Sequence, residues 1–137
     1  MALNLELSHG RPGASARVEI HERPDGRIAL LELHGWIEAV AVHRLGAALD
    51  DLASRGVTQL LLDCSHLRHI DYRHVPTLVA SLGRFESRAG GTVVCGLSPY
   101  LRDLFRLAGC EPDLRCWPSA DELLRPRDFE PSGERAS

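Results

Sequence analysis

The 137-residue chain contains no lysine, and all sixteen of its basic residues are arginine. A P-loop needs a lysine that reaches the β- and γ-phosphates, and a Schiff base needs a side-chain amine. Ser–Lys catalysis and the Lys–Glu pair of protein kinases require the same missing residue. The absence of lysine therefore excludes several classes of enzyme.

Other absences narrow the class of protein further. No apolar run approaches the ~20 residues of a membrane helix, and the net charge of −3 provides no basic field for nucleic acid or an anionic membrane. The first six residues lack the basic start and apolar stretch of a secretory signal. The four cysteines form no Cys-x-x-Cys pair and are too few for a disulfide scaffold. We therefore expect a cytoplasmic protein with no nucleic-acid partner and no segment inserted in a membrane.

The hydrophobic residues alternate between the period of a strand and that of a helix along most of the chain. Strands are predicted at 18–20, 28–33, 57–62, 92–96 and 114–117, and helices at 39–55, 75–85, 98–108 and from 119. Pro24-Asp25-Gly26 is turn chemistry and joins the first two strands in a hairpin. This order predicts one α/β domain over 17–125, with a mostly parallel sheet of about five strands and helices packed against it. We expect residues 1–16 to be a loose lead-in and residues 126–137 a disordered tail.

The densest polar stretch, residues 63–74, follows the third predicted strand. Functional groups in open α/β sheets gather at the carboxyl ends of strands, so this stretch is the candidate site. One hypothesis is a metal- or small-ligand-binding regulator, because His66, His69, His74 and Cys64 are all ligand types. The competing interpretation is that these histidines are solvated or hydrogen-bonded residues of a loop.

Two catalytic interpretations of the same stretch are weaker. Asp63 ends a strand as a phospho-accepting aspartate does, but the lysine and the acidic pair that such a site needs are missing. We expect Asp63 instead to accept hydrogen bonds from backbone N–H groups of its own segment. Cys64 and His66 do not make a catalytic pair by proximity alone, and Cys95 and Cys110 lie in apolar patterns where a thiol is usually buried and inert. We therefore expect neither an enzyme nor a cofactor.

A further hypothesis treats the end of this stretch as a docking surface. Asp71 is expected to cap the next helix, with Tyr72, Arg73 and His74 projecting from its first turn. Pro76 fits only within about that first turn. Tyrosine and arginine side by side on an exposed turn are the composition that protein interfaces favour, although the same residues could form only a solvated cap.

The order and spacing of several motifs resemble the STAS domain, which bacterial anti-sigma factor antagonists share with the tails of sulfate transporters. The matching features are Leu61-Leu62-Asp63 at a strand end, Ile70-Asp71 before a helix, Arg88-Ala89-Gly90-Gly91 before the next strand, and the segments 96–109 and 117–124. With the hairpin and Gly35, the resemblance covers most of 17–125. It implies a STAS-like fold and a non-enzymatic module of protein interaction in bacterial signalling and transcription regulation.

In that family, the aspartate that opens the helix is followed by a serine and then by a Ser or Thr that a partner kinase phosphorylates. Asp71 matches the aspartate, and Arg73 occupies the phospho-acceptor position, where a guanidinium cannot accept a phosphoryl group. The resemblance implies a protein partner, which could be a kinase-like anti-sigma factor, a sensor or a component of a membrane transporter. The partner-binding residues that it implies are Asp71, Tyr72, Arg73 and His74, with Trp36 and Glu38 from the neighbouring loop. Trp36 is either an exposed anchor or part of the core.

Overall fold

The computed structural model describes residues 2–10, 13–110 and 116–117. One six-stranded sheet carries the fold, and its strands lie in chain order. The strands are β1 (Ala2–Ser8), β2 (Ala14–Arg23), β3 (Gly26–Ile37), β4 (Val57–Ile70), β5 (Gly91–Cys95) and β6 (Cys116–Trp117). The helices are α1 (Ala39–Ser54), the single 3-10 turn η1 (Tyr72–His74), α2 (Val75–Arg88) and α3 (Pro99–Leu107).

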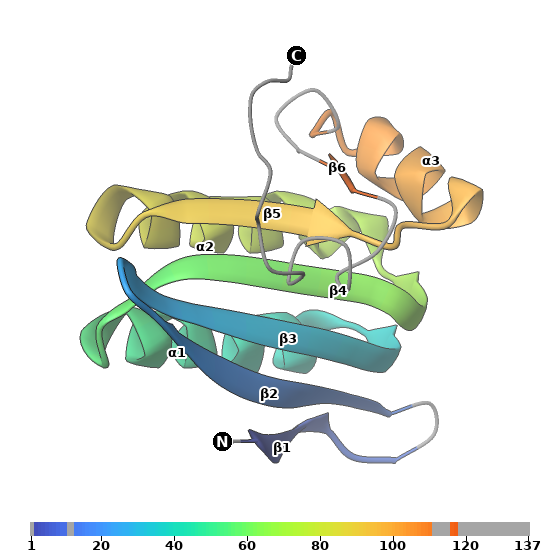
Figure 1. Cartoon of the computed structure of the whole chain (residues 1–137). Coiled ribbons are helices and arrows are strands. Elements are labelled where there is room, and N and C mark those ends of the chain that lie inside the picture. The colour runs from blue at the N-terminus through green and yellow to red at the C-terminus, as the bar shows by residue number, and fades with distance from the viewer. Residues whose placement is uncertain (1, 11–12, 111–115, 118–137) are drawn as a thin grey trace.

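The sheet is mixed, as the sequence predicted. Strands β1, β2 and β3 pair antiparallel, whereas β3, β4, β5 and β6 pair parallel. Parallel strands that follow one another in the chain are neighbours in the sheet, and their order across the sheet never reverses. Right-handed crossovers therefore place the connecting helices on one face. Helices α1 and α2 accordingly lie together behind the sheet in Figure 1 and contact each other. We call the opposite side of the sheet the second face.

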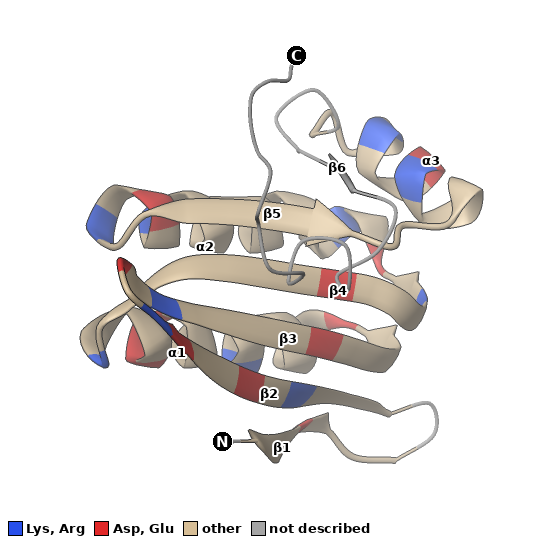
Figure 2. Cartoon of the chain, viewed as in Figure 1, with Lys and Arg blue, Asp and Glu red and all other residues tan. Residues whose placement is uncertain are grey.

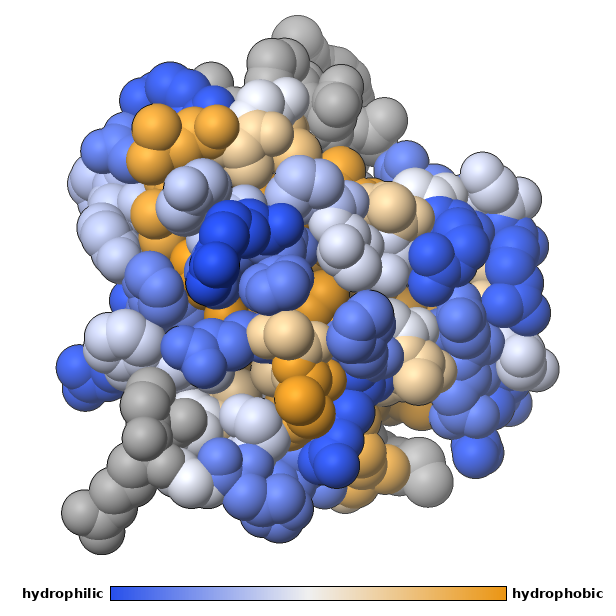
Figure 3. All heavy atoms as spheres, turned by 180° about the vertical axis from the view of Figure 1, so that it is seen from behind, coloured by the Kyte–Doolittle hydropathy of each residue, from blue (hydrophilic) through white to orange (hydrophobic). Residues whose placement is uncertain are grey.

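The main core lies between the sheet and the helices. The predicted helical stripes are buried, with Leu45 and Leu49 from α1 and Leu78 and Phe85 from α2 all 1% exposed or less. Alternate residues of the strands complete this core, since successive side chains of a strand point to opposite faces. Seen from behind, the helical side of the molecule is mainly hydrophilic, with hydrophobic atoms in scattered patches (Figure 3).

The expectation of a loose lead-in over 1–16 is wrong. Residues 2–8 form β1, which pairs antiparallel with β2, and β2 itself begins at Ala14. Leu3, Leu5 and Leu7 alternate with polar residues, which is the period of a strand. Leu7 is only 1% exposed and belongs to the main core, so burial of this side chain accounts for the extra strand.

The expectation of a loop after residue 62 is also wrong. Strand β4 continues to Ile70, because Leu67 and Ile70 face the main core and four of the residues 66–70 still pair with β3. Only Asp71 and the turn η1 separate β4 from α2. Strand β6 agrees with the predicted strand at 114–117 where the structure describes it. The predicted helix from 119 and the predicted tail at 126–137 lie outside the described residues.

Candidate functional site

A bulge in β4 decides which side chains reach the second face. Asp63 lies opposite Glu32 of β3, but the next paired position on β4 is His66, so one extra residue is inserted there. The carboxylate oxygen Oδ1 of Asp63 accepts hydrogen bonds from the Ser65 backbone N–H (3.0 Å) and from the Ser65 hydroxyl (2.6 Å). The predicted bonding of Asp63 to its own segment is confirmed, and the carboxylate closes the bulge.

The bulge separates the four candidate metal ligands. Cys64 is 1% exposed and lies in the main core, whereas His66 is exposed. The imidazole nitrogen Nδ1 of His69 lies 2.6 Å from the hydroxyl of Tyr100, and Nε2 of His74 lies 3.9 Å from Asp71. Within the described part of the chain, these four side chains are not one ligand group. The structure therefore does not bring Cys64, His66, His69 and His74 together as one site, because Cys64 faces the core and His74 lies beyond the end of β4.

A row of rings lies at the carboxyl ends of β3, β4 and β5. The rings of Trp36 and His69 are 4.7 Å apart, and those of His69 and Tyr100 are 5.8 Å apart. Trp36 remains 39% exposed, so it is a surface residue that packs on a neighbouring ring rather than a core residue. Sequence reasoning missed Tyr100, which reaches this row because Ser98 caps α3 through the backbone N–H of Leu101.

Asp71 organises the start of α2. Its backbone N–H donates to the carbonyl of Ile37 (2.9 Å), which fixes the aspartate at the end of β3. Its Oδ1 accepts from the backbone N–H of Arg73 (3.0 Å), so the predicted cap is present, although it caps η1 rather than α2 directly. Pro76 lies in the first turn of α2, where its missing N–H leaves no helix bond broken.

The side chain of Arg73 folds back on the same carboxylate. Its Nε donates to Oδ1 of Asp71 (3.1 Å) and its Nη2 to Oδ2 (2.7 Å), which is a bidentate pair. This geometry uses two of the five N–H donors of a guanidinium. The Arg73 side chain nevertheless stays 72% exposed, so the pair holds the guanidinium in one orientation at the surface.

The pair also sets the charge of the site. The Arg73 side chain, through its hydrogen bonds, lowers the pKa of Asp71 from 3.8 to about 2, with help from the Arg73 backbone N–H. The carboxylate in turn raises the pKa of Arg73, and the charge of Glu38 acts in the same direction. Both groups therefore remain ionised throughout the physiological range of pH.

We predict that replacing Arg73 with alanine raises the pKa of Asp71 from about 2 toward 3.8, because the strongest hydrogen bonds to the carboxylate are lost. The folded pKa lies below the unfolded one, so this contribution to stability is complete above pH 3.8 and disappears as the pH falls toward 2. Titration of the Asp71 carboxyl carbon by NMR in both proteins measures the shift. An Asp71 pKa that is equal in both would contradict the described pair.

A cavity of about 420 Å³ lies beside Arg73 and joins three segments that are distant in sequence. The end of β1, the start of α1 and the start of η1 all line it. Its wall includes Glu38 and the α1 residue Val40, which is 55% exposed. We define the Arg73 surface as the six residues that the sequence singled out, which are Trp36, Glu38, Asp71, Tyr72, Arg73 and His74. The structure brings Glu38, Asp71, Arg73 and His74 around this one cavity.

The comparison with protein families identifies the class of this domain. A family model described as Mlab, STAS domain, matches residues 20–115. The chain therefore belongs to the STAS domain family, as its motifs indicated. No curated protein sequence matches the chain.

Solved structures show the same fold at low sequence identity. The unphosphorylated anti-sigma factor antagonist SpoIIAA is 20% identical with a TM-score of 0.62, covering 78% of this chain and 92% of that chain. An anti-sigma factor antagonist from Mycobacterium paratuberculosis is 19% identical with a TM-score of 0.64, covering 86% and 96%. The Bacillus SpoIIAA in its phosphorylated form is 19% identical with a TM-score of 0.57, covering 78% and 96%. In the described part of this chain, no helix is long and apolar enough to cross a membrane.

Proposed function

We propose that the protein is a non-enzymatic, cytoplasmic regulatory module that binds a protein partner through the Arg73 surface. The clustering of exposed hydrophobic side chains carries this proposal. Six large hydrophobic residues are exposed in the described part of the chain, and four of them lie at or just after the carboxyl ends of β3, β4 and β5. These four are Trp36, Val40, Tyr72 and Tyr100. Aromatic side chains around an arginine are the usual composition of interface hot spots.

We further propose that this binding is not switched by phosphorylation at the usual position. Arg73 occupies that position by the motif resemblance, and it has no hydroxyl group. A phosphoserine would carry about −2 charge at neutral pH, whereas a guanidinium stays at +1. The bidentate bond to Asp71 also holds Arg73 in one orientation, so the surface presents a constant charge pattern.

The surface favours a partner with an apolar contact for Trp36 and Tyr72 and an acceptor group that meets the Arg73–Asp71 pair. A kinase-like anti-sigma factor fits the likeness to the antagonists, since anti-sigma factor antagonists are among the solved proteins with this fold. A sensor protein or a transporter component would be a different partner for the same surface.

A charge reversal at Arg73 tests the proposal. We expect Arg73→Glu to lower the affinity for a specific cytoplasmic protein about 30-fold, which corresponds to about 2 kcal/mol, because the reversed charge faces Asp71 and breaks the pair. Wild-type and variant proteins are immobilised, incubated with native cytoplasm, and compared by quantitative mass spectrometry of what they capture. The identity of the captured protein distinguishes the three kinds of partner.

Arg55→Glu is the matched control. Arg55 also forms an exposed pair with an aspartate, with its Nε 2.7 Å from Oδ2 of Asp51, but it lies just before β4 at the opposite end of the sheet. The control should capture as much partner as the wild type does. Equal losses in both variants, or no loss in Arg73→Glu, would rule out the Arg73 surface as the binding site.

A further inference from the structure

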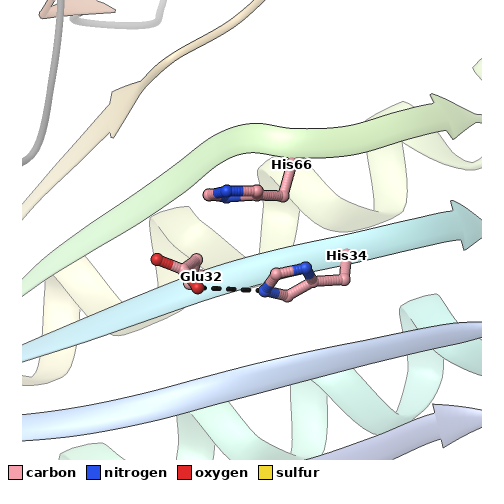
Figure 4. A group of neighbouring side chains, drawn as sticks. All are labelled: Glu32, His34 and His66. Carbon is pink, nitrogen blue, oxygen red and sulfur yellow. Dashed lines mark hydrogen bonds and ion pairs between the residues drawn. The ribbon is translucent and has the colours of Figure 1, made fainter.

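Three side chains on the second face of the sheet point toward one another, as the ligands of a metal ion do. Glu32 and His34 lie two residues apart on β3, so they point to the same face. The bulge in β4 brings His66 directly opposite His34, and the two imidazole rings stack with their centroids 4.8 Å apart. Figure 4 shows all three side chains on the side of the sheet away from the helices, with the carboxylate between the strands.

The donor atoms of this group lie close enough together to bind one metal ion after a small movement. One nitrogen or carboxylate oxygen from each of Glu32, His34 and His66 lies within 4.8 Å of the other two. Nε2 of His34 is 3.0 Å from Oε1 of Glu32. Tetrahedral zinc with bonds of 2.0–2.2 Å holds its ligand atoms roughly 3.3 Å apart, so the third side chain needs to move by only about an ångström or two. The His34 side chain is 39% exposed and His66 is exposed, which leaves both rings room to turn.

We propose that Glu32, His34 and His66 form a divalent-metal site on the second face, with Zn²⁺ as the metal that the donor set fits best. Two imidazoles and one carboxylate are the ligands of a three-residue zinc site, in which water or a partner group takes the fourth position. The site clamps β3 to β4 at the bulge. It is separate from the Arg73 surface, so either proposal stands without the other.

The charges around the site favour a cation. Figure 2 shows acidic residues on the neighbouring strands β2, β3 and β4, and the register places Asp63 directly opposite Glu32. Arg17 lies opposite Glu32 on the other side, but its guanidinium pairs with Glu19 at 3.0 Å. Next to Glu32, the carboxylates of Glu19, Glu32 and Asp63 therefore outnumber the one guanidinium of Arg17, although the three strands as a whole carry four carboxylates and four guanidiniums.

The molecule contains its own control for this proposal. His21 and Glu19 on β2 form the same kind of pair, two residues apart, with Nε2 and Oε1 separated by 3.2 Å. Their side chains are 40% and 28% exposed, against 39% and 25% for His34 and Glu32. In the described part of the chain, only the β3 pair meets a third ligand, which is His66. A specific site therefore requires His34 and His66 but not His21.

The test is titration of Zn²⁺ into the untagged full chain, read by calorimetry and by competition with a chromophoric chelator. We expect one ion per chain, and we expect His66→Ala and His34→Ala to weaken its binding on the order of a hundredfold, since even outer-shell changes cost about 10–100-fold. Glu32→Gln, which keeps the shape but removes the charge, should weaken it less. His21→Ala should bind as the wild type does.

The outcomes separate clearly. Circular dichroism verifies that each variant is folded, and the exposed position of His66 makes His66→Ala the variant whose fold is least affected. Loss of binding in the His34 and His66 variants, with unchanged binding in His21→Ala, supports the site. No stoichiometric binding by the wild type, or equal losses in His21→Ala and His34→Ala, overturns it and leaves a hydrogen-bonded stack of side chains.

Discussion

Gly35→Ala is expected to lower the free energy of unfolding by about 4 kcal/mol. Gly35 has a φ of +92°, and a Cβ added there would overlap the carbonyl oxygen of Gly13. The same oxygen accepts the backbone N–H of Trp36 at 2.9 Å, so it cannot retreat without breaking that bond. A non-glycine residue at positive φ costs about 1–2 kcal/mol, and forced overlap adds about 1–3 kcal/mol.

Gly56→Ala separates the cost of the positive φ from the cost of the overlap. Gly56 has a similar φ of +87°, but no atom lies within 4 Å of an added Cβ. It should cost only about 1–2 kcal/mol. Urea denaturation of the wild type and both variants gives the comparison. If the two variants lose the same stability, the close approach between β3 and the residue before β2 does not exist as described.

Phe85→Ala is expected to lower the free energy of unfolding by about 3–5 kcal/mol. Phe85 is 1% exposed and is among the largest fully buried side chains in the described part of the chain. Its removal leaves a cavity between α2 and the sheet that the surrounding side chains refill only in part. Because α2 begins directly after η1, we also expect the variant to bind less partner at temperatures where a fraction of it unfolds.

Leu107→Ala is the control for this second prediction, since Leu107 is 71% exposed. The free energy of unfolding of Leu107→Ala should lie within about 0.5 kcal/mol of that of the wild type. Thermal and chemical denaturation of both variants measure the difference. A Phe85 variant that is no less stable than the Leu107 variant would contradict the described packing of α2.

The helices and the parallel strands were predictable because their signals are local. Leu45 and Leu49 repeat at the helical period, and Ser98-Pro99 marks the start of α3 by its own chemistry. The bonding of Asp63 to its own segment was predictable for the same reason, since both partners lie within two residues. The strand β1 also had a local signal in its alternating leucines, but nearby Gly10, Pro12 and Gly13 are residues typical of turns and favour a loop.

The functional surfaces were predictable only in part. The sequence identified the Asp71 cap and the residues after it, because a cap acts within three residues of itself. It did not indicate that Arg73 would fold back on Asp71, nor that Val40 and Glu38 would lie beside the same cavity. It also grouped His66 with Cys64, His69 and His74, because the polar composition of residues 63–74 favours a loop, whereas β4 continues to Ile70.

The sequence by itself determined the α/β class of this domain, its order of elements from β2 to α3 and the absence of a hydroxyl at position 73, since each follows from residue type and spacing. Only the tertiary structure decided which side chains meet. His34 and His66 are thirty-two residues apart, and their meeting depends on the register of β3 against β4 and on one extra residue in a bulge. A shift of one residue moves every side chain of a strand to the other face. Pairing at that distance in sequence is therefore settled by the packing of the whole sheet.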